Sequence, residues 1–225
     1  MIQGMIWDAD GTLLDSMEIW EHAADRYLET LGVTPEPDLG DRLFPMSLEQ
    51  GAGYLIEQYQ LSVQVSDVLE GVHCQIERFY REEVTLKPGA RELLEILHQK
   101  GYPMVLATSG DPKCIRMACE RLQIQKYFTE LLFCSEMKVG KDQPDIYLEA
   151  ARRMHCNPNE VLVMEDALHA IETAKKAGFY TVAVYEKANR EQEKVRETAH
   201  ICLQSLERYE ALLEMLARGT DTWRK

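Results

Sequence analysis

Residues 2–12 read Ile-Gln-Gly-Met-Ile-Trp-Asp-Ala-Asp-Gly-Thr, a short apolar run that ends in two acidic residues and a glycine. Such a run is typical of a buried strand in a parallel sheet, with a loop where the polar residues begin. The stretch therefore predicts a first strand over about residues 2–7, with Asp8 and Asp10 at its carboxyl end.

The chain then changes to helical spacing and later back to an alternation of strands and helices. From Ser16 to about Glu83, apolar residues recur at helical spacing between turn-forming glycines and prolines. This spacing predicts three or four helices, near 16–31, 47–60 and 66–83, and no strand. From Pro88 onward, β-rich runs alternate with helical segments, as in a parallel sheet with crossover helices.

The prediction is an α/β fold in which a Rossmann-like parallel sheet core carries an inserted all-helical cap domain. Residues 1–15 and 86–225 are expected to form the core, and residues 16–85 the cap. Further strands are expected at 103–108, 131–134, 161–164, 180–184 and 199–203. Further helices are expected from Pro88 to just before Gly101, and at 112–122, 144–154, 167–177 and 206–216.

Composition excludes several classes of protein. The 225 residues, 45% hydrophobic and 28% charged, are enough for one core with a small additional domain and no disulfides. The first residues do not resemble a signal peptide, and no stretch approaches the ~20 apolar residues of a membrane span. A net charge of −13 argues against a nucleic-acid partner. We expect a cytoplasmic protein without a membrane partner, and a monomer rather than an oligomer.

Cysteines and charge add two further expectations. The six cysteines stand singly, without the spacing of a zinc site or a Cys-x-x-Cys pair, so we expect them to be reduced and structural. Between Ser16 and Leu86 there are fourteen acidic residues against four arginines and no lysine. Solvated helix faces are the favoured interpretation of this acidity, ahead of electrostatic selection of substrates.

The carboxylates of Asp8 and Asp10 stand two residues apart where a strand ends, so in extended backbone both can project to the same side. One carboxylate can attack phosphorus to form an aspartyl-phosphate, while its neighbour protonates the leaving oxygen and later accepts a proton from water. Gly11 allows the backbone to turn close to a substrate. An EF-hand calcium loop is excluded, because position 12 of such a loop, counted from Asp8, is Ile19 rather than Glu.

Four motifs in order resemble the haloacid dehalogenase superfamily, in its branch with a helical cap after the first motif. The first is Asp8-Ala-Asp10-Gly11-Thr12-Leu-Leu-Asp15-Ser16, and the others are Val105-Leu-Ala-Thr108-Ser109-Gly110, Gly140-Lys141-Asp-Gln-Pro144-Asp145-Ile-Tyr147 and Val161-Leu-Val-Met-Glu165-Asp166. The resemblance runs from about residue 2 to about residue 185. It implies an aspartyl-phosphate enzyme with Asp8 as nucleophile and Asp10 as general acid and base.

The resemblance also implies roles for the remaining motif residues. Thr108, with the following Ser109 and Gly110, is expected to hold the transferring phosphoryl group, and Lys141 to neutralise its charge. A cation must lie between an anionic nucleophile and an anionic phosphate, and Mg²⁺ takes oxygen ligands. Its expected ligands are Asp8, the backbone carbonyl of Asp10, Asp166 and the nearby Glu165.

The resemblance leaves several activities of the family open, and residues of the first motif and of the cap distinguish between them. Dehalogenases lack the second aspartate, and phosphonate-cleaving relatives use a cap lysine that this chain lacks. β-Phosphoglucomutases resemble the chain most closely, but they carry a cap histidine where this chain has Trp20, and a cap lysine. We therefore favour hydrolysis of a small phosphomonoester, such as a sugar phosphate, over mutase activity, and over non-catalytic binding of a phosphorylated ligand. Trp20 is interpreted either as an aromatic wall of the substrate pocket or as a helix core residue.

Overall fold

The computed structural model describes residues 1–218, and the chain divides into two compact units. One unit joins Met1–Asp15 to the chain from Thr85 onward, and the other, here called the helical unit, is Ser16–Val84. Thr85 groups with the first unit because it pairs with Asp15 in a short antiparallel ribbon of β2 (Leu14–Asp15) and β3 (Thr85–Leu86). Residues 219–225 of the expected core domain lie outside the described residues.

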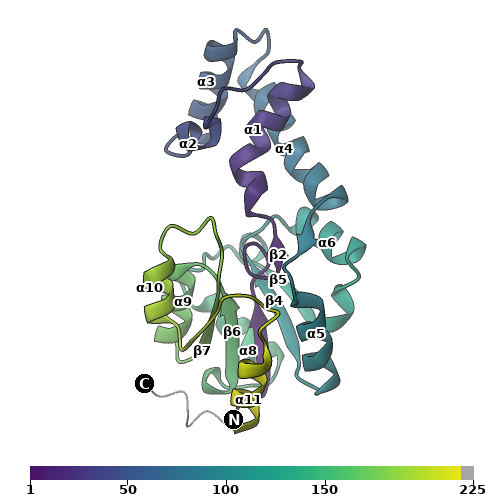
Figure 1. The fold of residues 1–225 in the computed structure, drawn as a ribbon, viewed down its shortest axis with the longest axis vertical. Coiled ribbons are helices and arrows are strands. Elements are labelled where there is room, and N and C mark those ends of the chain that lie inside the picture. The colour runs from purple at the N-terminus through teal and green to yellow at the C-terminus, as the bar shows by residue number, and fades with distance from the viewer. Residues whose placement is uncertain (219–225) are drawn as a thin grey trace. The chain divides into compact units, whose positions relative to one another are not determined.

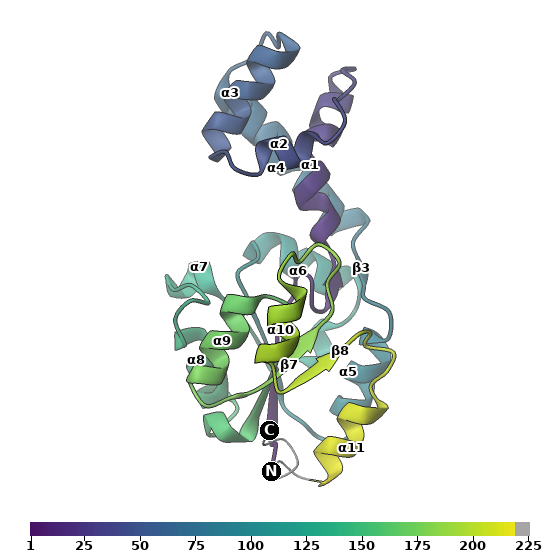
Figure 2. The same ribbon diagram turned by 60° about the vertical axis from the view of Figure 1, so that its left-hand side comes forward.

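The first unit is built on a six-stranded sheet in the order β5-β4-β1-β6-β7-β8, in which every neighbouring pair is parallel. Helices cover both faces of this sheet, so the predicted α/β fold is confirmed (Figures 1 and 2). The strands are β1 (Gly4–Trp7), β4 (Met104–Thr108), β5 (Glu130–Phe133), β6 (Val161–Glu165), β7 (Tyr180–Val184) and β8 (Ile201–Leu203). β1, which the first motif follows, is therefore one of the two central strands.

The helices of the first unit largely follow the expected segments. They are α5 (Ala90–Gln99), α6 (Pro112–Arg121), α7 (Cys134–Met137), α8 (Asp145–Arg153), α9 (Leu168–Lys176), α10 (Gln192–Thr198) and α11 (Glu210–Arg218). Cys134 was expected to end a strand, but it begins the short α7. α10 was not predicted because its seven residues bury only Val195, which leaves no apolar periodicity to detect.

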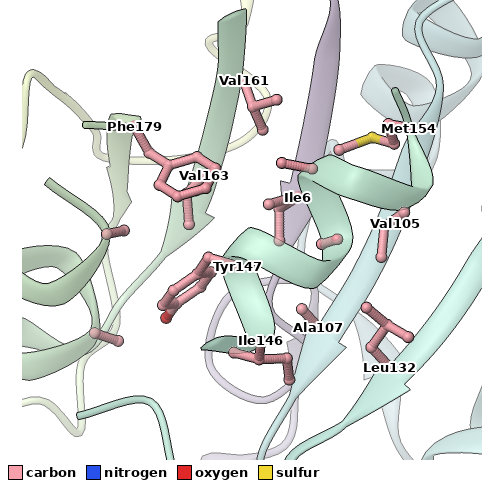
Figure 3. Close-up of a cluster of buried hydrophobic side chains, with 14 of the residues drawn as sticks. Ile6, Val105, Ala107, Leu132, Ile146, Tyr147, Met154, Val161, Val163 and Phe179 are labelled. Carbon is pink, nitrogen blue, oxygen red and sulfur yellow. The ribbon is translucent and has the colours of Figure 1, made fainter. Parts of the chain in front are cut away.

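One face of the sheet packs against α8 and α9 through a single buried cluster (Figure 3). Ile6, Val105 and Val163 point to this face from three neighbouring strands, and Tyr147 of α8 lies against them. Side chains alternate along a strand, so Trp7 belongs to the opposite face, where it is also fully buried. Burial of both faces explains why β1 is an almost continuous apolar run.

The helical unit contains α1 (Met17–Thr30), α2 (Leu39–Leu43), α3 (Leu48–Tyr59) and α4 (Val65–Glu82). It has a core of its own in which Tyr27, Leu28, Leu55 and Val68 are buried together. Trp20 is 51% exposed, so it is not a helix core residue. Within residues 1–218, no helix combines the length and apolar character that crossing a bilayer requires.

Candidate active site

The carboxyl ends of three adjacent strands, β4, β1 and β6, bring the sequence motifs to one edge of the sheet. Thr108 and Glu165 are the last residues of β4 and β6, and Asp8 directly follows β1. The backbone N–H of Asp8 donates to the carbonyl of Met164 at 3.0 Å, which continues the pairing of β1 with β6 past the end of β1. Open α/β sheets bind ligands at this edge.

Lys141 reaches this edge from the loop between α7 and α8 and contacts two carboxylates. Its Nζ donates to Oδ1 of Asp8, and to Oε1 of Glu165 at 2.6 Å. Asp8, Lys141 and Glu165 are only 7%, 5% and 2% exposed. These charges are therefore held in a medium that screens them poorly, where each one strongly affects the others.

The carboxylate of Glu165 is held through both of its oxygens. Oε2 accepts the backbone N–H of Asp166 at 2.9 Å and that of Ala167 at 3.1 Å. The hydroxyl of Tyr147 donates to Oε1 at 3.4 Å, in addition to the contact with Lys141. Glu165 thus links Lys141 to the backbone that presents Asp166.

The carboxylate of Asp166 faces the loop of the first motif. Its Oδ1 accepts the hydroxyl of Thr12 at 2.9 Å. A Cβ added to Gly11, whose φ is +78°, would lie 2.7 Å from Oδ2 of Asp166. Glycine is therefore required at position 11 both by the backbone conformation and by this close approach.

The second motif lies beside Asp10. A Cβ added to Gly110 would lie 2.6 Å from Oδ2 of Asp10, so these two residues are in close contact. The backbone N–H of Gly110 donates to Oγ1 of Thr108 at 2.9 Å, which leaves the hydroxyl hydrogen of Thr108 free to donate to a ligand. The hydroxyl of Ser109 lies 3.4 Å from the Cys134 sulfur. The hydroxyl of Thr108 is therefore available to an anion bound near Asp10.

The model of the haloacid dehalogenase-like hydrolases matches residues 5–184. The chain belongs to this family. It is a phosphatase of the haloacid dehalogenase-like hydrolases, because its relatives with known activities include several phosphatases.

Two such relatives and one solved structure illustrate the similarity. The phosphorylated carbohydrates phosphatase of Thermotoga maritima is 31% identical over 177 residues, covering 79% of this chain and 82% of the relative. Hexitol phosphatase A of Escherichia coli is 28% identical over 189 residues, covering 83% and 85%. A Thermotoga maritima crystal structure, provisionally named a β-phosphoglucomutase, superposes with a TM-score of 0.84 at 28% identity, over 95% of this chain and 99% of that one.

The donor set in this phosphatase fits a divalent metal ion. Asp8, Glu165 and Asp166 each offer one carboxylate oxygen, and these atoms lie within 4.8 Å of one another. When all three buried carboxylates are ionised, the single lysine leaves an excess of negative charge that a divalent cation would balance. Hard carboxylate oxygens are the ligands that such ions prefer.

The acid–base properties of the cluster agree with this excess of negative charge. Burial, followed by the neighbouring carboxylates of Glu165 and Asp166, raises the pKa of Asp8 well above its usual value despite the opposing effect of Lys141. Burial and Glu165 raise the pKa of Asp166 to about 7. Burial lowers the pKa of Lys141, but Asp8 and Glu165 outweigh it and raise this pKa well above the usual value, so the lysine is charged.

The structure also identifies residues that sequence reasoning did not select. Thr12 and Tyr147 were quoted within motifs, but only the fold shows that their hydroxyls contact Asp166 and Glu165. The side chain of Asn189, which lies outside all four motifs, donates to the carbonyl of Asp166 at 2.6 Å. No local pattern could reveal it, because it follows Asp166 by 23 residues in an irregular loop. Trp20 lies on α1 of the helical unit, with its side chain exposed.

Proposed function

We propose that this phosphatase hydrolyses small phosphomonoesters such as sugar or polyol phosphates, that it uses Mg²⁺, and that Asp8 carries an aspartyl-phosphate intermediate. The supporting observation is the position of Asp8 directly after β1, one of the two central strands, in contact with Lys141 and beside two further carboxylates. The names of the relatives, which act on phosphorylated carbohydrates and hexitol phosphates, agree with this substrate class.

In the first half-reaction, a carboxylate oxygen of Asp8 attacks phosphorus and the bond from phosphorus to the ester oxygen breaks. Asp10 gives its proton to the departing alcohol oxygen. Lys141 and the hydroxyl of Thr108 stabilise the charge on the phosphoryl oxygens, and the N–H groups that follow Thr108 assist. Bound Mg²⁺, held by Asp8, the carbonyl of Asp10, Asp166 and Glu165, would neutralise negative charge between nucleophile and substrate.

In the second half-reaction, Asp10 accepts a proton from water as the water oxygen attacks the phosphorus of the phosphorylated Asp8. The bond from phosphorus to the Asp8 oxygen breaks, which releases inorganic phosphate and restores both aspartates. Asp10 therefore needs to be protonated in one step and ionised in the next.

The charges of the helical unit favour a leaving group without a second anionic group. All four of its arginines already pair with glutamates: Arg26 with Glu83, Arg42 with Glu36, and both Arg78 and Arg81 with Glu82. The unit contains no lysine. If these helices select the substrate, as the family resemblance implies, we expect uncharged alcohols to be better leaving groups than phosphorylated or carboxylated ones.

Phosphate release from a panel of phosphomonoesters tests this proposal. The panel includes hexitol, glycerol and sugar monophosphates, phosphoglycolate and a sugar bisphosphate, each assayed in Mg²⁺ and in EDTA. We expect the highest kcat/KM for a monophosphate of a neutral polyol or sugar, and no release in EDTA. Equal rates with and without the metal would contradict the Mg²⁺ assignment, and a preference for phosphoglycolate or the bisphosphate would contradict the substrate class.

Mutase activity is the second candidate, because one similar structure carries a β-phosphoglucomutase name. A mutase must protect its aspartyl-phosphate from water while the sugar intermediate reorients. This chain has Trp20 in place of the family's cap histidine and no lysine in the helical unit. We expect β-glucose 1-phosphate, given with a trace of the 1,6-bisphosphate, to yield inorganic phosphate rather than glucose 6-phosphate. Phosphorus NMR of the products distinguishes these outcomes, and predominant glucose 6-phosphate would favour the mutase.

A further inference from the structure

The backbone of Asp166 is held on both sides by side chains of the first unit. Its N–H donates to Oε2 of Glu165, and its carbonyl accepts from Nδ2 of Asn189 at 2.6 Å. The other end of the Asn189 amide is also used, since Oδ1 accepts the backbone N–H of Glu191 at 2.8 Å. The amide of Asn189 therefore connects the proposed metal ligand Asp166 to the loop that follows β7.

That loop is organised around the buried carboxylate of Glu186, which is 2% exposed. Oε1 of Glu186 accepts the backbone N–H of Ala188 at 2.9 Å. The carbonyl of Glu186 accepts the backbone N–H of Asn189 at 3.0 Å, and also the side-chain amide of Gln192. These contacts fix the turn that carries Asn189.

The second carboxylate oxygen of Glu186 pairs with Lys87, the residue that follows β3. Nζ of Lys87 lies 2.6 Å from Oε2 of Glu186, and it donates to the carbonyl of Tyr185 at 2.7 Å. The backbone N–H of Lys87 donates to the carbonyl of Leu13, at the end of the first motif loop. The side chains of this ion pair are 11% and 2% exposed.

A buried ion pair gains little net stability, because the cost of removing both charges from water offsets their attraction. The pair does, however, fix the positions of the segments that it joins. In this fold it joins the start of the Asn189 loop to the chain between β3 and α5, and Asn189 in turn holds Asp166.

We propose that Asn189 is a positioning residue for the metal ligand Asp166, and that the buried Lys87–Glu186 pair holds the loop that presents Asn189. With its backbone tied by Glu165 and Asn189 and its Oδ1 held by Thr12, the carboxylate of Asp166 is oriented before a cation binds. Loss of such an outer contact typically weakens metal binding by about 10- to 100-fold. The proposal rests on the metal-dependent function proposed above.

Calorimetric titration of the EDTA-treated, dialysed protein with MgCl₂ measures this effect without an assay of activity. We expect Asn189→Ala to raise the Kd for Mg²⁺ by about tenfold or more, and to raise the Mg²⁺ concentration needed for half-maximal turnover by a similar factor. The matched control is Asn159→Ala, because Asn159 is an exposed asparagine beside the opposite, amino-terminal end of β6. A Kd for Asn189→Ala within about twofold of the parent and control values would overturn the role of Asn189.

The Lys87–Glu186 pair is tested by the double variant Lys87→Met with Glu186→Gln. This variant buries no lone charge, and the amide oxygen introduced at position 186 can still accept the N–H of Ala188, so we expect it to fold. We expect a weaker Mg²⁺ affinity than the parent, with a smaller change than in Asn189→Ala. An unchanged Kd would overturn the part assigned to the ion pair. If the parent itself bound no Mg²⁺, the proposed function would fail instead, so the two failures are distinguishable.

Discussion

The two units of this protein differ in whether they bury charged side chains, although both carry charged pairs on their surfaces. In the first unit, Asp8, Lys141, Glu165 and Asp166 are between 2% and 7% exposed. Lys141 pairs with Asp8 and Glu165, and one oxygen from each of the three carboxylates lies within 4.8 Å of the others. In the helical unit, the charged pairs lie on the surface, as in Arg78–Glu82, whose side chains are 57% and 48% exposed.

This contrast distinguishes buried charges, which serve the chemistry of a site, from exposed charges, which keep the protein soluble. Burying an ion costs several kcal/mol unless partners offset it, so a cluster of like charges persists only where a ligand or reaction needs it. Exposed pairs are screened by water and contribute little. Loss of a single charge in the buried cluster should therefore have a strong effect, and loss of an exposed charge in the helical unit a weak one.

Asp8→Asn should produce the largest effect, because an amide is a poor nucleophile and a weaker metal ligand than a carboxylate. We expect turnover to fall to background while the fold is retained, since the substitution removes one of three crowded acids. Steady-state phosphate release and circular dichroism measure the two properties. Turnover that stays within about tenfold of the parent, a change of only about 1.4 kcal/mol in the barrier, would contradict the nucleophile assignment.

Lys141→Met should destabilise the protein as well as inactivate it. Removing the cation leaves the buried carboxylates unpaired, which typically costs about 3–5 kcal/mol. Urea denaturation in EDTA measures this loss, and we expect Mg²⁺ to restore part of it. Lys100→Met, at an exposed position at the end of α5, is the control and should leave the midpoint unchanged. Equal midpoints for the two variants would show that the cluster does not depend on Lys141.

Asp10→Asn should slow turnover by roughly 10²–10⁴-fold, the range typical of a general acid and base. The rate of the first half-reaction should fall less with para-nitrophenyl phosphate than with an alkyl phosphate, because the para-nitrophenolate leaving group needs little protonation. Single-turnover phosphorylation of Asp8 compares the two substrates. Equal losses with both would mean that Asp10 does not protonate the leaving group.

Metal-free protein should lose stability with rising pH because of Asp166. The pKa of this group in the folded protein is about 7 against an ordinary value of 3.8, so protonation favours the folded state. Its contribution is fully present below about pH 4 and is lost as the pH rises through 7. We expect Asp166→Asn in EDTA to gain stability relative to the parent between pH 5 and pH 8, as measured by urea denaturation. A difference in stability between Asp166→Asn and the parent that does not change with pH would contradict the raised pKa of Asp166.

Arg78→Gln should have the smallest effect. It removes an exposed ion pair on α4, where the side chains are well solvated. We expect the urea midpoint and kcat to match those of the parent within experimental error. A clear loss of stability would show that surface charge supports the helical unit more than the contrast with the first unit implies.

Much of the fold could be predicted from local sequence. The apolar runs before Asp8, before Ser109 and before Asp166 became β1, β4 and β6, because consecutive buried residues in a parallel sheet leave a clear pattern. α10 left no such pattern, since one buried residue in seven gives no periodicity. Trp20 illustrates a different limit. The spacing of apolar residues in its helix could not show whether its side chain is buried in the core or exposed, and in the structure it is 51% exposed.

The sequence by itself determined which chemical groups this phosphatase carries, because motif residues such as Asp8, Asp10 and Lys141 stand at recognisable positions relative to strands. Only the tertiary structure decided how these groups are held. Lys141 meets Asp8 across 133 residues, Thr12 meets Asp166 across 154, and Asn189 reaches the carbonyl of Asp166 from a loop outside every motif. Local spacing carries no information about such contacts, because they depend on the order of strands in the sheet and on the packing of loops at its edge.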